Sequence, residues 1–424
     1  MTYEQARQYI DMMSKTGIVL GLESIKNLLA ELGNPQDDLK FVHIAGTNGK
    51  GSALAFISTI LEVAGYKTGR YVSPTVQSYR ERIQINRTNI TKTDFAAGLL
   101  KIKKAVETMR AKGLLQPSVF EIETALGFLH FKEQGCDIVV METGMGGRTD
   151  ATNIIQNTLV AVITSVSRDH MEFLGDTIAD LTRAKVGIIK PDSHIIHGEL
   201  PLEALEIIQH FDNKCHILDK NDLIIQKSPK KYIQIFNYQN IQNLEINLLG
   251  RHQVENATLA ILAIQSLQEQ GFVITDEQIK QGLVATEWYA RITVVKEKNP
   301  TIIVDGSHNQ DSVRKLAETL SELFPTERIV AVMGVFKDKE VVEILTEIKP
   351  VISKIHAITL PDEKRTIQAD DLAQLAVANG IEAESHATLK SAVTKAISEA
   401  EVVIAFGSFS YLGNILKLIK TDEP

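Results

Sequence analysis

The chain has 424 residues, of which 44% are apolar and 23% charged, and its formal net charge is −8 at pH 7. This length predicts two or three domains of roughly 100–200 residues each. The acidic balance argues weakly against nucleic acid as the main partner, but it leaves room for a locally basic site. No apolar run approaches the roughly 20 residues of a membrane span, and the amphipathic N-terminal segment does not resemble a signal peptide. The two cysteines provide neither a disulfide framework nor metal spacing, so we expect a cytoplasmic globular protein without a membrane segment.

Strand and helix signals alternate through the first half of the chain. The predicted strands are 41–45, 68–72, 137–142, 158–166 and 194–197, and the predicted helices are 52–64, 94–112, 121–134, 176–189 and 202–211. Such alternation is typical of a mostly parallel sheet covered by helices. Residues 223–249 then alternate with period two and contain turn residues, which favours antiparallel strands.

The second half repeats the α/β pattern after a charged segment. Helices are predicted near 254–270 and 276–285, and residues 296–300, which end in proline, are interpreted as a linker. Beyond them, strands are predicted near 301–305, 328–335, 355–360 and 402–406, with helices near 311–323, 340–347, 369–379 and 389–399. We therefore expect two α/β domains, residues 1–296 and 297–424, on either side of a cleft that can close.

A glycine-rich loop, Gly46–Ser52, joins the first predicted strand to a helix. Its glycines let the backbone approach an anion, and the start of the helix directs free N–H groups towards it. Lys50 adds a positive charge, and the Ser52 hydroxyl can bind Mg²⁺. The strict pattern G-x-x-x-x-G-K-[ST] is not met, because Gly51 separates the lysine from the serine. The order strand, loop, helix nevertheless favours a phosphate site over a simple turn, formed by Thr47, Asn48, Gly49, Lys50, Gly51 and Ser52.

Polar side chains follow several predicted strands of the first domain. In open parallel sheets, ligands bind at the carboxyl ends of the strands. Ser73, Glu142 and His170 occupy such positions, so with Ser52 they could converge on one Mg²⁺. Because Mg²⁺ prefers oxygen ligands, the histidine is the unusual member. The alternatives are a surface carboxylate for Glu142 and a structural loop histidine for His170.

Three further residues are candidates for ligand contacts near the predicted domain junction. Asp305 and His308 follow a strand of the second domain, where they could contact a ribose hydroxyl and a phosphate; the alternative is a polar turn. Arg291, just before the predicted linker, could bind a phosphate or could simply be exposed. On helical periodicity alone, Lys185 is a solvated lysine.

Taken together, these segments resemble the folylpolyglutamate synthase and dihydrofolate synthase family, a branch of the Mur ligases. The match runs through "GLESIKNLLAELGNPQ", "HIAGTNGKGS", "YVSPTVQSYRERI", "VFEIETA", "METGMGGRTDATN", "TSVSRDHMEFLG", "AKVGIIK", "HQVENA", "WYARI", "VDGSHN" and "FGSFSYLG". The order and spacing of these motifs are much more specific than the glycine-rich loop alone. Tyr289 stands where proline is typical and Val186 where alanine is typical, but no departure removes a proposed metal or phosphate group.

The resemblance implies a P-loop ATPase domain of the Mur ligase type with a second, smaller Rossmann-like α/β domain. It also implies an ATP-dependent amide ligase. In this reaction a folate carboxylate attacks the γ-phosphate of ATP, and the amine of L-glutamate then displaces phosphate from the acyl phosphate. Phosphoryl transfer needs alignment and charge neutralisation, which Mg²⁺, Lys50 and the loop amides would supply. The acceptor would be a reduced folate or dihydropteroate, and the family suggests a monomer.

The resemblance also assigns roles to individual residues. It places one Mg²⁺ on Ser73, Glu142 and His170. It also matches Lys185 to a lysine that the family carries as a carbamate, whose oxygens suit a second Mg²⁺. This match replaces the interpretation of Lys185 as a solvated lysine. Lys50, His170 and Lys185 would be the catalytic residues. Asn256, Arg291 and Asp305 match ATP-binding positions, with His308 close by; the substrate-binding residues would be Leu20, Ser73, Arg82, Phe120, Glu121 and Asp150.

Three other classes of protein remain as alternatives. A cell-wall Mur ligase would need a UDP-binding domain before the phosphate loop, and the loop begins too early, at Gly46, to leave room for one. A small-molecule kinase would stop at phosphoryl transfer, and a nucleotide-dependent switch would show little turnover. The second α/β domain favours a ligase, because it can bring in a third substrate.

Overall fold

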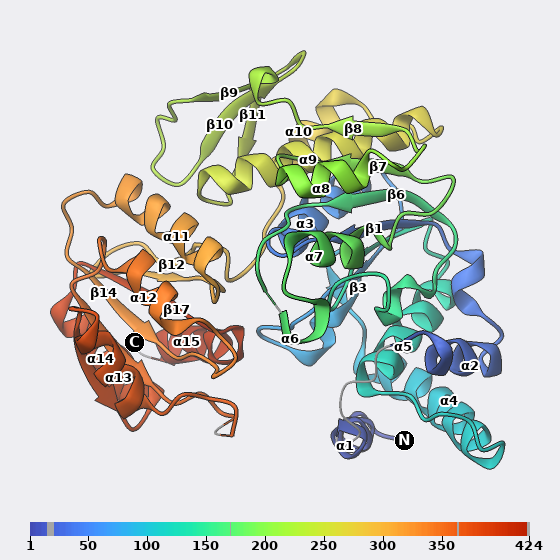
Figure 1. Cartoon of the computed structure of the whole chain (residues 1–424), viewed down its shortest axis with the longest axis horizontal. Helices are drawn as coiled ribbons and strands as arrows, with labels where there is room; N and C mark the ends of the chain where they lie inside the picture. The colour runs from blue at the N-terminus through green and yellow to red at the C-terminus, as the bar shows by residue number, and fades with distance from the viewer. Residues whose placement is uncertain (15–20, 170, 363, 422–424) are drawn as a thin grey trace.

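The computed structural model describes residues 1–14, 21–169, 171–362 and 364–421, and it consists of two α/β domains beside each other (Figure 1). The first domain contains an eight-stranded sheet of order β4-β3-β2-β5-β1-β6-β7-β8, and the second a six-stranded sheet of order β12-β13-β17-β14-β15-β16. The predicted fold class, two α/β units with mostly parallel sheets, is confirmed. Among the described helices, none is long and apolar enough to cross a membrane.

In the first sheet, β1 lies at the centre and pairs in parallel with β5 and β6. The strands are β1 (Phe41–Ala45), β2 (Thr68–Tyr71), β3 (Ile83–Ile85), β4 (Thr88–Asn89), β5 (Ile138–Glu142), β6 (Thr158–Ile163), β7 (His194–His197) and β8 (Cys215–Ile217). The helices of this part of the chain are α1 (Tyr3–Met13), α2 (Glu23–Glu31), α3 (Lys50–Val63), α4 (Lys92–Ala111), α5 (Val119–Glu133), α6 (Met171–Leu174), α7 (Ile178–Val186) and α8 (Leu202–Ile208). All five residues of β1 and of β5 are buried, so both strands deliver their last residues to the centre of the sheet edge.

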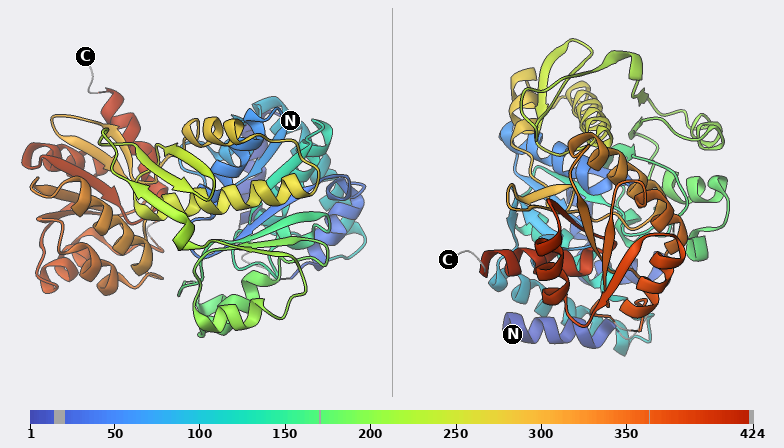
Figure 2. Two further views of the ribbon diagram at one scale, coloured as in Figure 1. Left: turned by 90° about the horizontal axis from the view of Figure 1, so that it is seen from above. Right: turned by 90° about the vertical axis from the view of Figure 1, so that its left-hand side faces the viewer.

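The predicted antiparallel stretch forms a separate three-stranded sheet of order β11-β10-β9. It comprises β9 (Leu223–Gln226), β10 (Gln234–Tyr238) and β11 (Ile241–Ile246), and it is followed by α9 (Arg251–Glu269) and α10 (Asp276–Val284). This small sheet lies against α9 and α10 (Figure 2). Helix α9 packs in turn along α3, in a core that includes Phe56, Ile57 and Ile261. Helix α3 is therefore held firmly behind the glycine-rich loop that precedes it.

A hairpin of two strands spans the predicted boundary between the domains. Strand β12 (Thr293–Lys296) pairs in antiparallel fashion with β13 (Thr301–Val304), so residues 297–300 form the turn of a hairpin. The interpretation of residues 296–300 as a linker is therefore wrong. A boundary between residues 296 and 297 would divide this hairpin; we propose that the second domain starts before Thr293. Its other elements are α11 (Gln310–Leu323), β14 (Ile329–Met333), α12 (Val341–Ile348), β15 (Lys354–Ile358), α13 (Ala369–Ala378), β16 (Glu382–His386), α14 (Leu389–Glu399), β17 (Val402–Phe406) and α15 (Phe409–Thr421).

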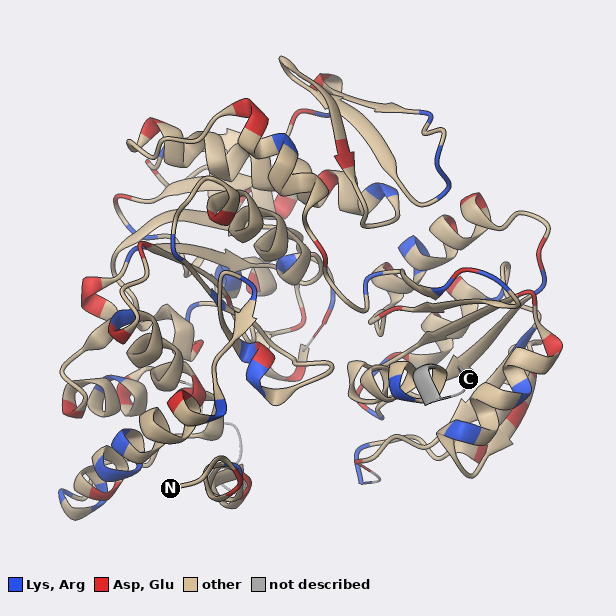
Figure 3. Ribbon diagram, turned by 180° about the vertical axis from the view of Figure 1, so that it is seen from behind, with Lys and Arg blue, Asp and Glu red and all other residues tan. Residues whose placement is uncertain are grey.

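Acidic and basic residues are interspersed over both domains (Figure 3). The charges that matter for a ligand are therefore those that individual loops bring together. The carboxyl ends of β1, β5 and β6 meet at one edge of the first sheet, and the chain segments around Arg291 and after β13 approach this edge from the other side. The site lies at this junction.

Candidate functional site

Two adjoining cavities lie where the domains meet. The first, of about 620 Å³, is lined by the glycine-rich loop, the ends of β5 and β6, and residues of the second domain. The second, of about 790 Å³, extends beside α5. The residues that line both are Ser73, Pro74, Gly144, Met145, His308 and Phe409. A ligand in one cavity can therefore reach a ligand in the other.

The glycine-rich loop lines the first cavity and leads directly into α3. Gly49 has φ +89° and stands at the N-terminus of α3, and a Cβ there would lie 2.5 Å from Asn256 Oδ1, so only glycine fits. Lys50 Nζ donates to the carbonyl oxygens of Gly46 (2.8 Å) and Thr47 (3.2 Å). Burial lowers the pKa of Lys50. The loop, the free N–H groups of the helix start and this ammonium form an anion site.

Ser52 is buried, with 1% of its surface exposed. Its Oγ makes no hydrogen bond to any described residue. Buried hydroxyls are normally paired, so an orphaned one beside a phosphate loop indicates a missing ligand such as a cation or a phosphate oxygen.

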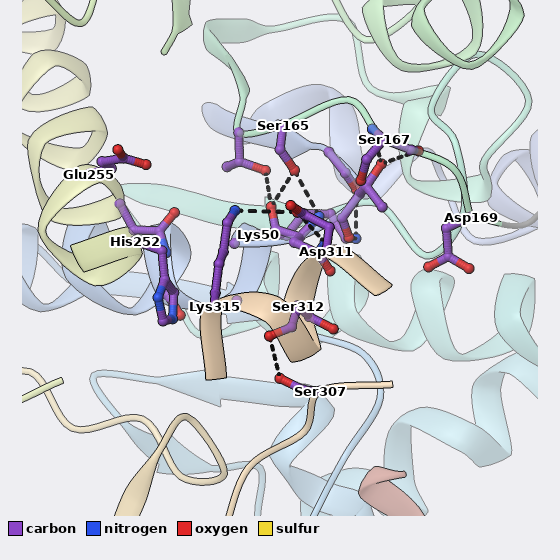
Figure 4. Close-up of a pocket in the computed structure, with 18 of the residues that line it drawn as sticks. Lys50, Ser165, Ser167, Asp169, His252, Glu255, Ser307, Asp311, Ser312 and Lys315 are labelled. Atoms are coloured by element: carbon purple, nitrogen blue, oxygen red, sulfur yellow. Dashed lines mark hydrogen bonds and ion pairs between the residues drawn. The ribbon is translucent and has the colours of Figure 1, made fainter. Parts of the chain in front are cut away.

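The loop that follows β6 holds the glycine-rich loop in place (Figure 4). Thr164 Oγ1 and Ser165 Oγ donate to the carbonyl oxygen of Asn48 at 2.6 and 3.0 Å, and Thr47 Oγ1 donates to the carbonyl of Ser167 at 2.9 Å. Strand β6 ends at Ile163, earlier than predicted, because these hydroxyl residues leave the sheet to bind the loop. Their role was not predicted.

The end of β5 brings a carboxylate to the same cavity. Glu142 is 3% exposed and accepts a hydrogen bond from the Ser73 backbone N–H. Burial raises the pKa of Glu142, and the nearby Lys50 charge acts in the opposite direction. A surface position for Glu142 is therefore excluded. Ser52, Ser73 and Glu142 all line this cavity, which fits a cation site of oxygen ligands; the fourth predicted ligand, His170, lies outside the described residues.

Lys185, on α7, is buried and lines the same cavity. Only 3% of its surface is exposed, so its interpretation as a solvated helix lysine is wrong. Burial, reinforced by the nearby charge of Lys50, lowers the pKa of Lys185 to about 8. A substantial fraction of this amine is neutral near physiological pH, which makes it unusually reactive for a lysine.

Arg291 approaches the glycine-rich loop from the domain junction. Its guanidinium lies 4.6 Å from the centroid of the Phe409 ring, and burial lowers its pKa, which excludes an exposed arginine. A Cβ on Gly51 would be 3.5 Å from Arg291 Nη2, so the guanidinium reaches the first turn of α3. The flanking residues Ala290 and Ile292 have φ of +60° and +47°. Positive φ is uncommon for any residue other than glycine, and it is most unfavourable for a β-branched residue such as Ile292. Such backbone strain typically persists where it positions a functional group.

The turn after β13 is ordered by Asp305. Its Oδ2 accepts from the Ile292 N–H at 2.7 Å and its Oδ1 from the Ser307 N–H at 2.9 Å. The Asp305 carboxylate thus joins the segment Ala290–Ile292 to the turn after β13. The contact of Asp305 with a ribose hydroxyl stays a prediction. His308 lies in the wall between the two cavities, and burial lowers its pKa.

Direct contacts between the domains surround the site. The side-chain amides of Asn48 and Asn309 donate to each other at 3.2 and 3.1 Å, and Asn48 Nδ2 also lies 3.1 Å from Asp311 Oδ2. Lys339 Nζ lies 3.0 Å from Asp169 Oδ1. Asp311 and Lys339 were missed by the sequence analysis, since nothing local distinguishes them from other charged residues.

The second cavity contains the predicted substrate-binding residues that the structure describes. Arg82, Phe120, Glu121 and Asp150 line it together with Ser73; Leu20 lies outside the described residues. Glu121 Oε2 accepts from the Ser118 N–H at 2.7 Å, so it also caps α5. Arg82 pairs with Glu123, which sequence reasoning missed, at 3.2 Å.

Asp150 is held from within the first sheet. Its Oδ1 accepts from Thr152 Oγ1 at 2.6 Å, and Thr152 Oγ1 lies 2.9 Å from His43 Nε2. Its Oδ2 accepts from the Met145 N–H at 2.8 Å. The carboxylate is therefore fixed in orientation before any ligand binds.

The fold and site define an ATPase-like domain coupled to a second α/β domain. Comparisons with known proteins identify the family that has this arrangement. Residues 44–264 match the Mur ligase middle domain, and residues 290–409 match the glutamate ligase domain of Mur ligases. The Bacillus subtilis dihydrofolate synthase/folylpolyglutamate synthase is 33% identical over 99% of both chains, and the Lacticaseibacillus casei folylpolyglutamate synthase is 30% identical over 87% of both.

Solved structures agree with these sequence relatives. Escherichia coli FolC in complex with DHPP and ADP superposes with a TM-score of 0.88 at 25% identity and covers 100% of this chain and 99% of its own. Mycobacterium tuberculosis folylpolyglutamate synthase complexed with ADP gives a TM-score of 0.89 at 27% identity, covering 98% of both chains. The protein belongs to the folylpolyglutamate synthase/dihydrofolate synthase family of the Mur ligases.

Proposed function

We propose that this protein is an ATP-dependent ligase that adds L-glutamate to reduced folates. The observation that carries the proposal is the pair of adjoining cavities, one built on the phosphate loop and the other on Phe120 and Asp150, with a glutamate-ligase domain closing over both. Relatives that match most of the chain are named for this activity, and the solved structures of the Escherichia coli and Mycobacterium tuberculosis enzymes hold ADP. ATP is therefore the nucleotide.

The reaction follows from this arrangement in two steps. A carboxylate oxygen of the folate attacks the γ-phosphorus of ATP, and the bond from that phosphorus to the bridging oxygen breaks, so that ADP leaves. The glutamate amine then attacks the acyl carbon, the bond to phosphate breaks, and the nitrogen loses a proton. Lys50, Arg291 and the loop N–H groups counter the negative charge on the phosphates during the first step.

Two Mg²⁺ ions are part of the proposal. Ser52, Ser73 and Glu142 would hold one, with His170 as the further predicted ligand, and the orphaned Ser52 Oγ supports this assignment. When bound, the ions supply charge neutralisation at the phosphates. We further propose that Lys185 carries a carbamate whose oxygens bind the second ion. Its burial and lowered pKa support this, because carbamylation requires a neutral amine.

A second substrate, dihydropteroate, is supported by two observations. Several relatives are named for both dihydrofolate synthase and folylpolyglutamate synthase activity. The cavity beside α5 is lined by Asp150 and Arg82, and the pterin ring that these polar groups would contact is common to dihydropteroate and the reduced folates. A monomeric state and a cytoplasmic location stay predictions.

Phosphate release from ATP tests the proposed function directly. A ligase releases phosphate only when both L-glutamate and a folate acceptor are present. A small-molecule kinase would turn over without glutamate, and a nucleotide switch would show little turnover in any mixture. Parallel reactions with dihydropteroate and with a tetrahydrofolate would establish which acceptors are used.

A further inference from the structure

A cluster of histidine and glutamate side chains lies at the edge of the second sheet, away from both cavities. It is formed by His356 on β15 and by Glu384 and His386 on the parallel edge strand β16. In the register of these strands, His356 lies opposite Glu384, and Ile358 lies opposite His386. Residues two apart on a strand share a face, so the three side chains project towards one region.

The ligand atoms in this cluster are close enough to share one ion. His356 Nδ1 lies 2.8 Å from His386 Nε2, and His386 Nε2 lies 3.8 Å from Glu384 Oε1. His356 is fully buried, and the side chain of His386 is 8% exposed. Nitrogen ligands of zinc bind at about 2.0–2.1 Å, so a small rotation of either ring would accommodate an ion between them.

The other nitrogen of His356 provides independent support. His356 Nε2 makes no hydrogen bond to a described residue, and it lies 3.3 Å from Glu399 Oε2, on the helix α14 that covers this face. This oxygen also forms an ion pair with Lys354 Nζ at 3.3 Å. Metal-binding histidines characteristically donate their second N–H to a carboxylate, which fixes the tautomer and the ring orientation. An ion on Nδ1 would place the proton on Nε2, facing Glu399.

The charges in and around the cluster are nearly balanced, and the excess negative charge is that of the Glu384 ligand. Lys354 Nζ lies 3.3 Å from Glu382, 3.2 Å from Glu384 Oε2 and 3.3 Å from Glu399, and Lys395 lies 2.9 Å from Glu399. Three carboxylates against two ammonium groups leave a net charge of −1. Because Lys354 binds Oε2 of Glu384, Oε1 is the oxygen that faces His386.

We propose that His356 Nδ1, His386 Nε2 and Glu384 Oε1 bind one divalent transition-metal ion of the zinc, cobalt or nickel class. Imidazole nitrogens favour these metals, whereas Mg²⁺ favours sites made only of oxygen atoms. The ion would fasten the edge strand β16 to β15. The site is separate from the phosphate loop and does not depend on the proposed function.

A second cluster, His194, His216 and Glu269, has the same residue types and serves as a matched control. There, Lys214 Nζ lies 2.7 Å from Glu269 Oε2, the same oxygen that lies 3.2 Å from His216 Nε2 and 3.6 Å from His194 Nδ1. The ammonium thus pairs with the one carboxylate oxygen that faces both histidines, and His194 Nδ1 already contacts Ser266 Oγ at 2.8 Å. We expect no comparable metal affinity at this control cluster.

Zinc titration of the full chain, stripped of metal with a chelator and kept in excess Mg²⁺, tests the proposal. Calorimetry should show one Zn²⁺ per chain, and Co²⁺ should give the absorption bands of a nitrogen-ligated ion. His386→Gln and Glu384→Gln should each weaken Zn²⁺ binding by at least about tenfold. His216→Gln, in the control cluster, and Glu142→Gln, at the phosphate site, should leave it unchanged.

Thermal unfolding supplies a readout that does not depend on stoichiometry. Zn²⁺ should raise the Tm of the wild type and of His216→Gln but not that of His386→Gln, because an ion that binds only the folded state stabilises it. The Tm of His386→Gln without metal, compared with that of the stripped wild type, shows whether this variant folds. Absence of Zn²⁺ binding, binding unaffected by His386→Gln, or binding lost in His216→Gln or Glu142→Gln would each overturn the proposal.

Discussion

Lys339 Nζ, in the second domain, lies 3.0 Å from Asp169 Oδ1, in the first, and both side chains are only 10% exposed. The pair holds the two domains together directly beside the phosphate-loop cavity, where Asn309 Nδ2 also donates to Asp169 Oδ2 at 3.3 Å. Because these contacts join the two domains at the site, we expect assembly of the site to depend on them.

Lys339→Met should therefore impair closure. We expect kcat/KM for the complete reaction to fall by at least about tenfold, since the substitution removes a charge partner of a largely buried carboxylate and a direct link between the domains. Lys337→Met, two residues away and exposed, is the matched control and should retain wild-type activity. Equal activity of the two variants in a steady-state phosphate-release assay would show that the pair is not needed for catalysis.

Lys50→Ala should lower kcat by about 10²–10³-fold, the usual effect of removing one group that stabilises charge in a transition state. The fold should survive, because among the described residues Lys50 Nζ donates to two carbonyl oxygens of its own loop and not to the core. Lys104→Ala, on the exposed side of α4, controls for general effects of losing a lysine. Near-normal turnover in folded Lys50→Ala would contradict the phosphate-site assignment.

Glu142→Gln should raise the Mg²⁺ concentration needed for half-maximal turnover. The substitution keeps the size of the side chain and an oxygen that can accept from the Ser73 N–H, but it removes the charge that attracts a cation. His170→Ala should act in the same direction if His170 is a ligand. An unchanged Mg²⁺ dependence in Glu142→Gln would remove Glu142 from the metal site.

Lys185→Ala should abolish turnover while leaving the fold intact, because a carbamate at this position would provide oxygen ligands for the second ion. Formate or acetate should partly restore activity by occupying the vacated space. The pKa of Lys185, about 8, predicts that bicarbonate activates the wild type more at higher pH, where more of the amine is neutral. A fully active Lys185→Ala enzyme would contradict this role, and electron density for a bare amine would contradict the carbamate.

His43 should make the stability of the fold depend on pH. Burial lowers its pKa from 6.5 to about 3. Between these values the unfolded chain binds a proton that the folded chain does not, so stability is lost as the pH falls from 6.5 towards 3. For one proton the slope approaches about 1.4 kcal/mol per pH unit.

Denaturant unfolding across this pH range would measure the effect of His43. His43→Gln should flatten the pH dependence of the unfolding free energy relative to the wild type, whereas the exposed His210→Gln should not. If the slopes of His43→Gln and the wild type coincide, other groups govern acid stability. Because His43 contacts Thr152, which contacts Asp150, His43→Gln should also raise the KM for the folate substrate.

The central sheet and the phosphate loop could be predicted because their signals are local. The buried strands 41–45 and 194–197 coincide with β1 and β7, and helix 389–399 coincides with α14. Strand β16 was missed because Glu382, Glu384 and His386 give an edge strand a polar sequence. Residues 296–300 were misinterpreted because a charged hairpin turn that contains proline has the composition of a linker.

Burial at the site could not be predicted from helical periodicity. Lys185 lies on the face of α7 that lines the phosphate-loop cavity. Which face of α7 does so is set by the path of the loop after β6, which contacts the phosphate loop. The resemblance to a family corrected the interpretation of Lys185, but it did not indicate the contacts Asn48–Asn309 and Asp169–Lys339. Those contacts join segments far apart in the chain, and only the packing of the two domains brings them together.

The strained segment Ala290–Ile292 has a consequence for how the protein uses ATP. The chain passes from one domain to the other here, so any rotation of the second domain must carry Arg291 with it. Nucleotide bound to the first domain alone would lack this guanidinium, and γ-phosphoryl transfer to water would be slow. On the proposed role of Arg291 in phosphate binding, the protein should thus be protected against wasteful ATP hydrolysis, because this guanidinium arrives only with the second domain.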